Sequence, residues 1–89
     1  MTLDDLRENL KTAYKAYVEH RAKQNPPKGS RLTNMREAYT FSKKVLHGSP
    51  NITPNYRIVV NNLVRAGDIY YHAKKHGLQS AILLKLSMD

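Results

Sequence analysis

Cysteine and tryptophan are absent from this 89-residue chain, which also has only one phenylalanine. Without cysteine there can be no disulfide, no thiolate nucleophile and no cysteine-ligated zinc site. No apolar run approaches the roughly 18 residues of a membrane span, and the opening residues MTLDDLREN lack the apolar stretch of a signal peptide. We therefore expect a soluble cytoplasmic protein that does not insert into a membrane.

Motifs that carry chemistry are equally scarce. The chain has no glycine-rich phosphate loop and no serine in a nucleophile-elbow context. His72 and His76 are one helical turn apart, but Lys74 and Lys75 beside them would repel a cation, and no third ligand is evident. Three of the seven carboxylates cluster near the start of the chain, where helix capping accounts for them. We expect no catalysis, no cofactor and no metal site.

One stretch carries the clearest structural pattern, from Thr53 to Leu78. Thr53 can cap a helix whose first residue is Pro54, a position where the missing N–H costs nothing. Gly77 can adopt the left-handed conformation that ends a helix. This pattern predicts a central helix with an apolar face too wide for a surface helix: Tyr56, Ile58, Val59, Val60, Leu63, Val64, Ala66, Gly67, Ile69, Tyr70, Tyr71 and Ala73.

The remaining residues predict three more helices. One spans Thr2–Gln24 and begins with a capping pair of Thr2 and Asp5. A loop with two prolines ends it, and a second helix follows over Arg31–His47, capped by Asn34 with Glu37 or one turn earlier by Ser30. A short helix over 81–87, capped by Ser80, closes the chain. We predict an all-α fold with one domain over residues 1–89: a bundle of three long helices plus a short carboxy-terminal helix.

The helical periodicity also predicts which side chains form the core. Gly67 is unfavourable inside a helix by about 1 kcal/mol relative to alanine. It either allows another helix to approach closely or is tolerated because packing overrides propensity. Tyr14 and Tyr71 are the tyrosines expected to be exposed. The residues expected to be buried are Leu6, Leu10, Tyr17, Met35, Tyr39, Val45, Val60, Leu63 and Tyr70.

Positive charge is the strongest feature of the composition. Lys and Arg number 15 against 7 Asp and Glu, which gives a net charge of +8. Such a balance in a small protein favours polyanionic partners, most often nucleic acid, although a merely solubilising surface would look the same. We expect DNA rather than RNA as a weak preference. The cations expected to neutralise phosphates are Lys23, Lys28, Arg31, Arg36, Lys43 and Lys44.

Two segments resemble a known family. YVEHRAKQNPPKGSRLTNMREAYTFSKKVLHG, followed by NYRIVVNNLVRAGDIYYHAKKHGL, is similar to the amino-terminal core-binding domain of tyrosine recombinases and phage integrases. That family grips one side of DNA with this helical domain. The chain differs from the pattern in lacking the catalytic domain and most of the segment between the two matching helices. The resemblance implies phosphate contacts from Lys28, Ser30, Arg31 and Thr33, with Asn34 and Arg36 nearer the groove.

The end of the chain supports a different function. Residues 82–88 are apolar nearly all round, so they must fold back over the other helices or pair with another chain. The sequence therefore leaves two hypotheses open. The first is a small, basic, non-catalytic nucleic-acid-binding protein with an accessory or regulatory role. The alternative is a helical protein-interaction module, an adaptor or inhibitor that occludes a partner protein, and the chain could be a monomer or a homodimer in either case.

Overall fold

Four helices account for nearly all of the described structure. The computed structural model describes residues 1–23, 34–48 and 52–88. They form α1 (Leu3–Lys23), α2 (Met35–Gly48), α3 (Pro54–His76) and α4 (Leu78–Met88), with no strand among the described residues. The predicted all-α class is confirmed. The predicted arrangement of three longer helices and a short carboxy-terminal one roughly fits, since α1, α2 and α3 have 21, 14 and 23 residues and α4 has 11.

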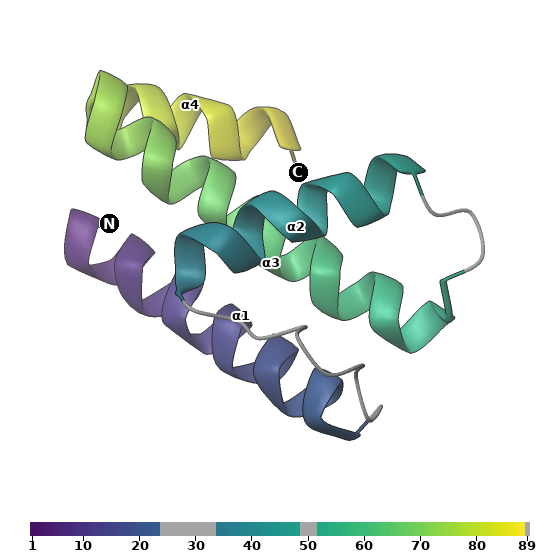
Figure 1. Ribbon diagram of the computed structural model, residues 1–89. Helices are drawn as coiled ribbons and strands as arrows, with labels where there is room; N and C mark the ends of the chain where they lie inside the picture. The colour runs from purple at the N-terminus through teal and green to yellow at the C-terminus, as the bar shows by residue number, and fades with distance from the viewer. Residues whose placement is uncertain (24–33, 49–51, 89) are drawn as a thin grey trace.

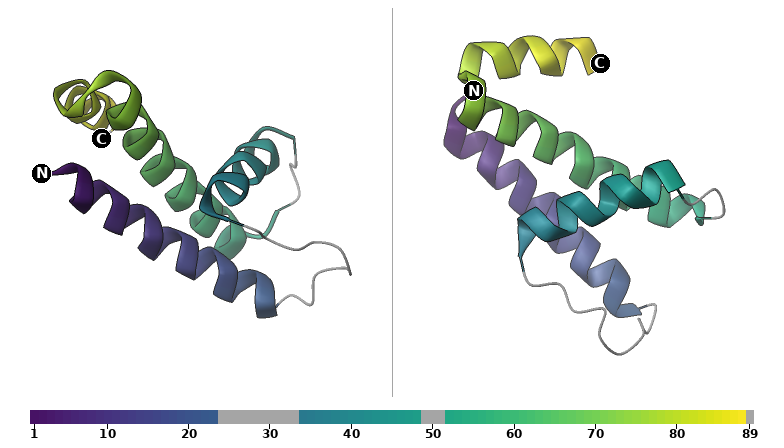
Figure 2. Two further views of the ribbon diagram at one scale, coloured as in Figure 1. Left: turned by 60° about the vertical axis from the view of Figure 1, so that its left-hand side comes forward. Right: turned by 45° about the horizontal axis from the view of Figure 1, so that its top comes forward.

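Helix α3 lies at the centre of this arrangement. Helices α1, α2 and α4 all pack on α3, whereas α1 and α2 have little contact with one another (Figure 1). Helices α1 and α3 run antiparallel, so that Leu6 packs near Ala73 at one end and Tyr17 near Tyr56 at the other. Helix α2 crosses α3, and α4 turns back over the carboxy-terminal part of α3 (Figure 2). The apolar face of α3 is wide because it serves three neighbours.

Side-chain caps begin three of the helices, at the residues that the sequence pattern predicts. Thr2 and Asp5 form a reciprocal pair, in which each backbone N–H donates to the other side chain at 3.0 and 3.2 Å. The Asn34 carboxamide accepts from the Glu37 N–H at 2.9 Å, and α2 begins directly after it, at Met35, so Asn34 is the cap and not part of the helix as the predicted range Arg31–His47 had it. Thr53 Oγ1 likewise accepts from the Tyr56 N–H at 3.2 Å. Each cap satisfies an N–H that has no partner inside its own helix.

The joint between α3 and α4 differs from the prediction. Gly77 has φ 98° and ψ 157°, and its N–H donates to the Ala73 carbonyl at 2.9 Å. The positive φ was expected, but this ψ lies outside the left-handed helical region, in a conformation essentially restricted to glycine. The Ala81 N–H donates to the Gly77 carbonyl, so α4 begins at Leu78 rather than at Ala81. Ser80 is therefore inside the helix and is not its cap.

The buried side chains form two clusters along α3. In the larger cluster Leu10, Val60 and Leu63 are fully buried, together with Tyr17 and Ala38. The smaller cluster joins α1, α3 and α4 through Leu6, Ile69, Ala73 and Ala81. Of the nine predicted core residues, seven are buried, whereas Met35 and Tyr70 are half-buried at the edge of the larger cluster. The periodicity therefore identified the buried stripes and overestimated the burial at their edges.

Gly67 lies at a close contact between α3 and the Tyr39 side chain of α2. A Cβ atom built on Gly67 would lie 2.7 Å from Cε1 of Tyr39 and closer still to Cδ1. Real Cβ atoms do not approach other heavy atoms this closely. Of the two interpretations that the sequence leaves open, the structure supports close helix approach, and the ring of Tyr39 occupies the space that a side chain would fill.

Candidate nucleic-acid interface

A cluster of cations and tyrosine rings lies where the start of α2 meets the carboxy-terminal half of α3. The Arg36 guanidinium carbon is 4.3 Å from the ring centroid of Tyr71 and 5.7 Å from that of Tyr39. Lys43 Nζ lies 5.1 Å from the same Tyr39 centroid. Arg36, Tyr39 and Lys43 follow one another at spacings of three and four, which places them on one face of α2. The stack on tyrosine holds the Arg36 cation near the surface at a defined position.

The last turns of α3 complete the cluster. The rings of Tyr39 and Tyr71 are 5.1 Å apart at a tilt of 48°, and Tyr70 meets Tyr71 edge-on at 5.3 Å. Lys74 Nζ lies 5.6 Å from the centroid of the Tyr70 ring. Lys74 and Lys75 are both exposed. The tyrosine rings therefore lie beneath cations that come from two helices, α2 and α3.

Two shallow hollows adjoin each other on this surface. One of about 570 Å³ is lined by residues of α1, α2 and α3, and one of about 400 Å³ shares Arg36, Tyr71 and Lys74 with it. Among the described residues that line them are four cations and no carboxylate. We call this region, together with Lys43 and Tyr39, the Arg36 surface. The lining residues of the two hollows are Arg7, Asn34, Met35, Arg36, Tyr70, Tyr71, Lys74 and Lys75.

Tyr39 connects the Arg36 surface to the interior. Its hydroxyl donates a hydrogen bond to the half-buried carboxylate of Asp68 on α3. Burial raises the pKa of Tyr39 well above its ordinary value of 10.0, and the hydrogen bond to Asp68 raises it further. Burial also raises the pKa of Tyr71, and the nearby Arg36 cation opposes that rise. The Asp68 carboxylate therefore accepts a hydrogen bond from Tyr39, whose ring lies beneath Arg36 and Lys43.

Because the pKa of Tyr39 is higher in the folded state than in the unfolded state, the free energy of unfolding changes with pH in the alkaline range. The stabilisation is fully present below pH 10, the ordinary pKa, and is lost as the pH rises toward the higher folded-state value. One proton contributes a slope of at most about 1.4 kcal/mol per pH unit. We expect Tyr39→Phe to make the fall in unfolding free energy above pH 10 shallower than in the wild type. Urea denaturation at several pH values measures both slopes, and parallel curves would contradict the assignment.

The structure groups some of the predicted site residues and separates others. Arg36 and Lys43 belong to the Arg36 surface, and Asn34 lines its hollow while capping α2. Lys23 is exposed in the last turn of α1, at the opposite end of that helix from Arg7. Lys44 is exposed, but one residue along a helix turns it about 100° away from Lys43. The predicted positions Lys28, Ser30, Arg31 and Thr33 lie outside the described residues.

Several members of the Arg36 surface are not among the residues predicted from the sequence. Lys74 and Lys75 had an adequate local explanation, because cations stabilise the carboxy-terminal end of a helix. Arg7 lies in a helix with nearly balanced charge. Tyr71 was expected to be exposed, but it is half-buried between Arg36, Tyr39 and Tyr70. The available signal was an aromatic pair, Tyr70 and Tyr71, with a lysine pair one helical turn further on.

Other classes of site find little support in the described part of the chain. No group of three metal-binding side chains occurs there. The predicted histidine pair does exist, since the rings of His72 and His76 are 4.8 Å apart, and His72 Nε2 lies 2.7 Å from Ser80 Oγ. Among the described helices, none is both long and apolar enough to cross a membrane.

Comparison of the chain with protein-family models, with curated proteins and with solved structures finds no match in any of the three. The resemblance to the core-binding domain of tyrosine recombinases therefore stays a prediction. Any functional assignment rests on the geometry of the side chains.

Proposed function

We propose that this protein binds nucleic acid through the Arg36 surface, without catalysing a reaction, as an accessory or regulatory factor. The observation that carries the proposal is the convergence of Arg7, Arg36, Lys74 and Lys75 from three helices around hollows in which the described lining contains no carboxylate. Phosphate is the anion that such a surface fits best. Lysine contributes point charges, and arginine presents a planar fork of donors.

The contacts of the tyrosine rings favour duplex over single-stranded nucleic acid. A protein that binds single strands leaves aromatic faces open for bases to stack on. Here Arg36 covers Tyr71, Lys43 covers Tyr39, and Lys74 covers Tyr70. The rings therefore support cations rather than bases. Binding by phosphate neutralisation along a duplex backbone follows, with DNA as the preferred duplex and little dependence on base sequence.

Salt dependence tests this mechanism. Each phosphate that a cation neutralises releases counterions, so log K falls with log salt at about −0.9 per contact on duplex DNA. We expect Lys74→Gln with Lys75→Gln to make that slope shallower by about two contacts and to weaken binding at low salt. Both lysines are exposed, so the variant should fold, with a modest loss of melting temperature because two cations are removed from the carboxy-terminal end of α3. Fluorescence anisotropy with duplex and single-stranded DNA over a salt series measures each slope.

A control variant distinguishes binding at the Arg36 surface from binding that depends only on the net charge of the protein. Lys15→Gln with Arg57→Gln removes the same amount of positive charge, and both residues are exposed and line neither hollow. This variant should keep a slope close to that of the wild type. If both double variants lose affinity equally, the binding depends on total charge and the Arg36 surface has no special role. Absence of binding by the wild type at low salt would reject the nucleic-acid proposal.

One observation favours the alternative, a protein-interaction module. The outer face of α4 exposes Leu83 and Leu86 at 68% and 66%, although Ala81 on its inner face is fully buried. Apolar side chains this exposed on one short helix are typical of a surface that another protein covers. The wide apolar face of α3 is largely covered by α1, α2 and α4, although Ile58 is 58% exposed. The alternative therefore depends mainly on α4.

A further inference from the structure

A second hollow lies on a different part of the molecule, between α1, α3 and α4. It has a volume of about 200 Å³, and the described residues that line it include no carboxylate. Leu6 and Ile69 are buried, and with Ala66 they form an apolar wall. The polar lining consists of two cations and two carboxamides: Arg65, Lys85, Asn9 and Asn62.

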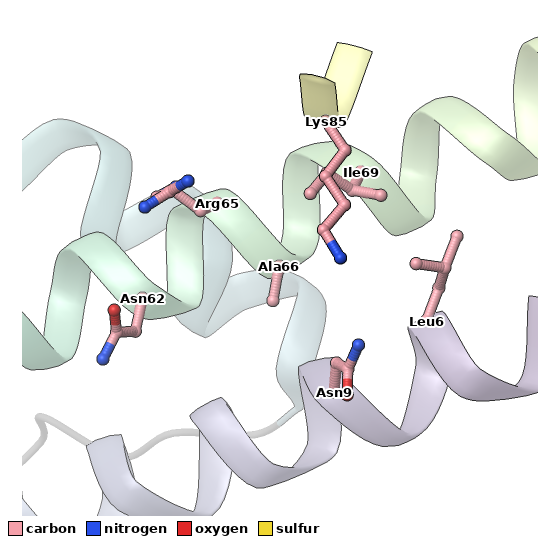
Figure 3. A pocket seen from close by; sticks show the side chains of 7 residues that line it. All are labelled: Leu6, Asn9, Asn62, Arg65, Ala66, Ile69 and Lys85. Carbon is pink, nitrogen blue, oxygen red and sulfur yellow. The ribbon is translucent and has the colours of Figure 1, made fainter. Parts of the chain in front are cut away.

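The polar groups of α1 and α4 point toward each other across this hollow. The side chain of Lys85 extends from α4 into the space between α3 and α1, and the carboxamide of Asn9 points up from α1 (Figure 3). The apolar side chains of Leu6, Ala66 and Ile69 lie beside them in the same view. Lys85 is half-buried, whereas Leu83 and Leu86 on the same helix are exposed. An ammonium group and a carboxamide thus line one hollow beside an apolar wall.

We propose that this hollow binds a small carboxylate with a short apolar body. The carboxylate accepts hydrogen bonds from Lys85 Nζ and from the Asn9 carboxamide, and the apolar body packs on Leu6, Ala66 and Ile69. A cavity of roughly 150 Å³ holds a benzene ring, so a hollow of about 200 Å³ fits a ring with one carboxylate. An inorganic phosphate would leave the apolar wall in contact with water.

This ligand contacts three helices at once and would therefore stabilise the docking of α4. A ligand that binds the folded state and not the unfolded state raises the melting temperature as its concentration increases. A ligand with about nine heavy atoms is expected to bind with a Kd near 1 mM at best. The site is separate from the Arg36 surface, with which it shares no lining residue.

Benzoate is the probe that tests the proposal, with benzamide as its uncharged counterpart. We expect benzoate to raise the melting temperature of the wild type and to shift the methyl NMR signals of Leu6, Ala66 and Ile69. Lys85→Met keeps the apolar stem and removes the charge. It should weaken benzoate binding by about tenfold, since a charge-assisted hydrogen bond is lost. Lys15→Gln, on an exposed part of α1 that lines neither this hollow nor the Arg36 surface, is the matched control and should bind benzoate like the wild type.

The outcomes are distinct. Equal binding of benzoate and benzamide would overturn the proposal, because the charge of the ligand would then be irrelevant. Equal benzoate affinity in the wild type and in Lys85→Met would overturn it as well. Lys85→Gln provides a second variant, checked for folding by circular dichroism, in case the methionine variant is unstable. Methyl signals that do not move at benzoate concentrations well above the expected Kd would show that the hollow binds no such ligand.

Discussion

Leu63→Ala is expected to lower the free energy of unfolding by about 2–5 kcal/mol, the range for truncating a buried leucine. Leu63 is fully buried in the larger cluster, where α1, α2 and α3 meet. The substitution removes apolar contacts and leaves a cavity, because neighbours on three helices cannot all collapse into it. For a domain of this size, even 1 kcal/mol shifts the melting temperature by roughly 4–8 °C. Thermal and urea denaturation followed by circular dichroism measures the loss.

A matched substitution on the same helix tests the assignment of α3 as the organising element. Ile58 lies five residues before Leu63 and is 58% exposed. We expect Ile58→Ala to change the unfolding free energy by no more than about 0.5 kcal/mol, as is usual for surface substitutions. If Leu63→Ala proved as harmless as Ile58→Ala, the packing described around α3 would be wrong.

Gly67→Ala is expected to destabilise the fold, although helix propensity alone predicts the opposite. In an unhindered helix interior the exchange of glycine for alanine gains about 1 kcal/mol. Here the added methyl group would collide with the ring of Tyr39. That ring cannot swing away freely, since its hydroxyl is bonded to Asp68 and its faces contact Arg36 and Tyr71. Overpacking of this kind costs about 1–3 kcal/mol, so we expect a net loss in chemical denaturation.

Two further variants separate overpacking from other effects at Gly67. Gly48→Ala adds the same methyl group in α2 where nothing lies within 4 Å, so it should be neutral or slightly stabilising. In a Tyr39→Ala background the obstacle is gone, and Gly67→Ala should then show the gain that propensity predicts. A double-mutant cycle measures this coupling. If Gly67→Ala were equally harmful with and without the tyrosine ring, close approach of α2 would not be the reason for the glycine.

The beginnings of the first three helices were readable because they depend on neighbouring residues. Thr2, Asn34 and Thr53 each bond an N–H three residues further along the chain, so the relevant partners are visible in the sequence. The start of α4 was not readable in this way. Ser80 looks like a cap, but the hydrogen bond from Ala81 to the Gly77 carbonyl extends the helix to Leu78. That bond requires the unusual backbone conformation of Gly77, which nothing in the sequence specifies beyond the glycine itself.

The candidate interface was predictable only in part, for a related reason. Arg36 and Lys43 were recognisable as cations on one face of a helix. That Lys74 and Arg7 would join them depends on where α2 crosses α3, and side-chain periodicity contains no information about a crossing point. The proposed carboxylate site shows the same limitation. Asn9 and Lys85 are far apart in sequence and line one hollow through the packing of α1 and α4 against α3.

The sequence by itself determined the class of this protein: helical elements, their apolar stripes and an excess of positive charge all follow from local spacing and composition. Tertiary structure decided how these features combine. The absence of a side chain at Gly67 lets the Tyr39 ring pack against α3, and that contact places Arg36 over Tyr71. Helix propensities act within one turn, whereas a binding surface forms where side chains from several helices meet, and only the packed core sets that meeting point.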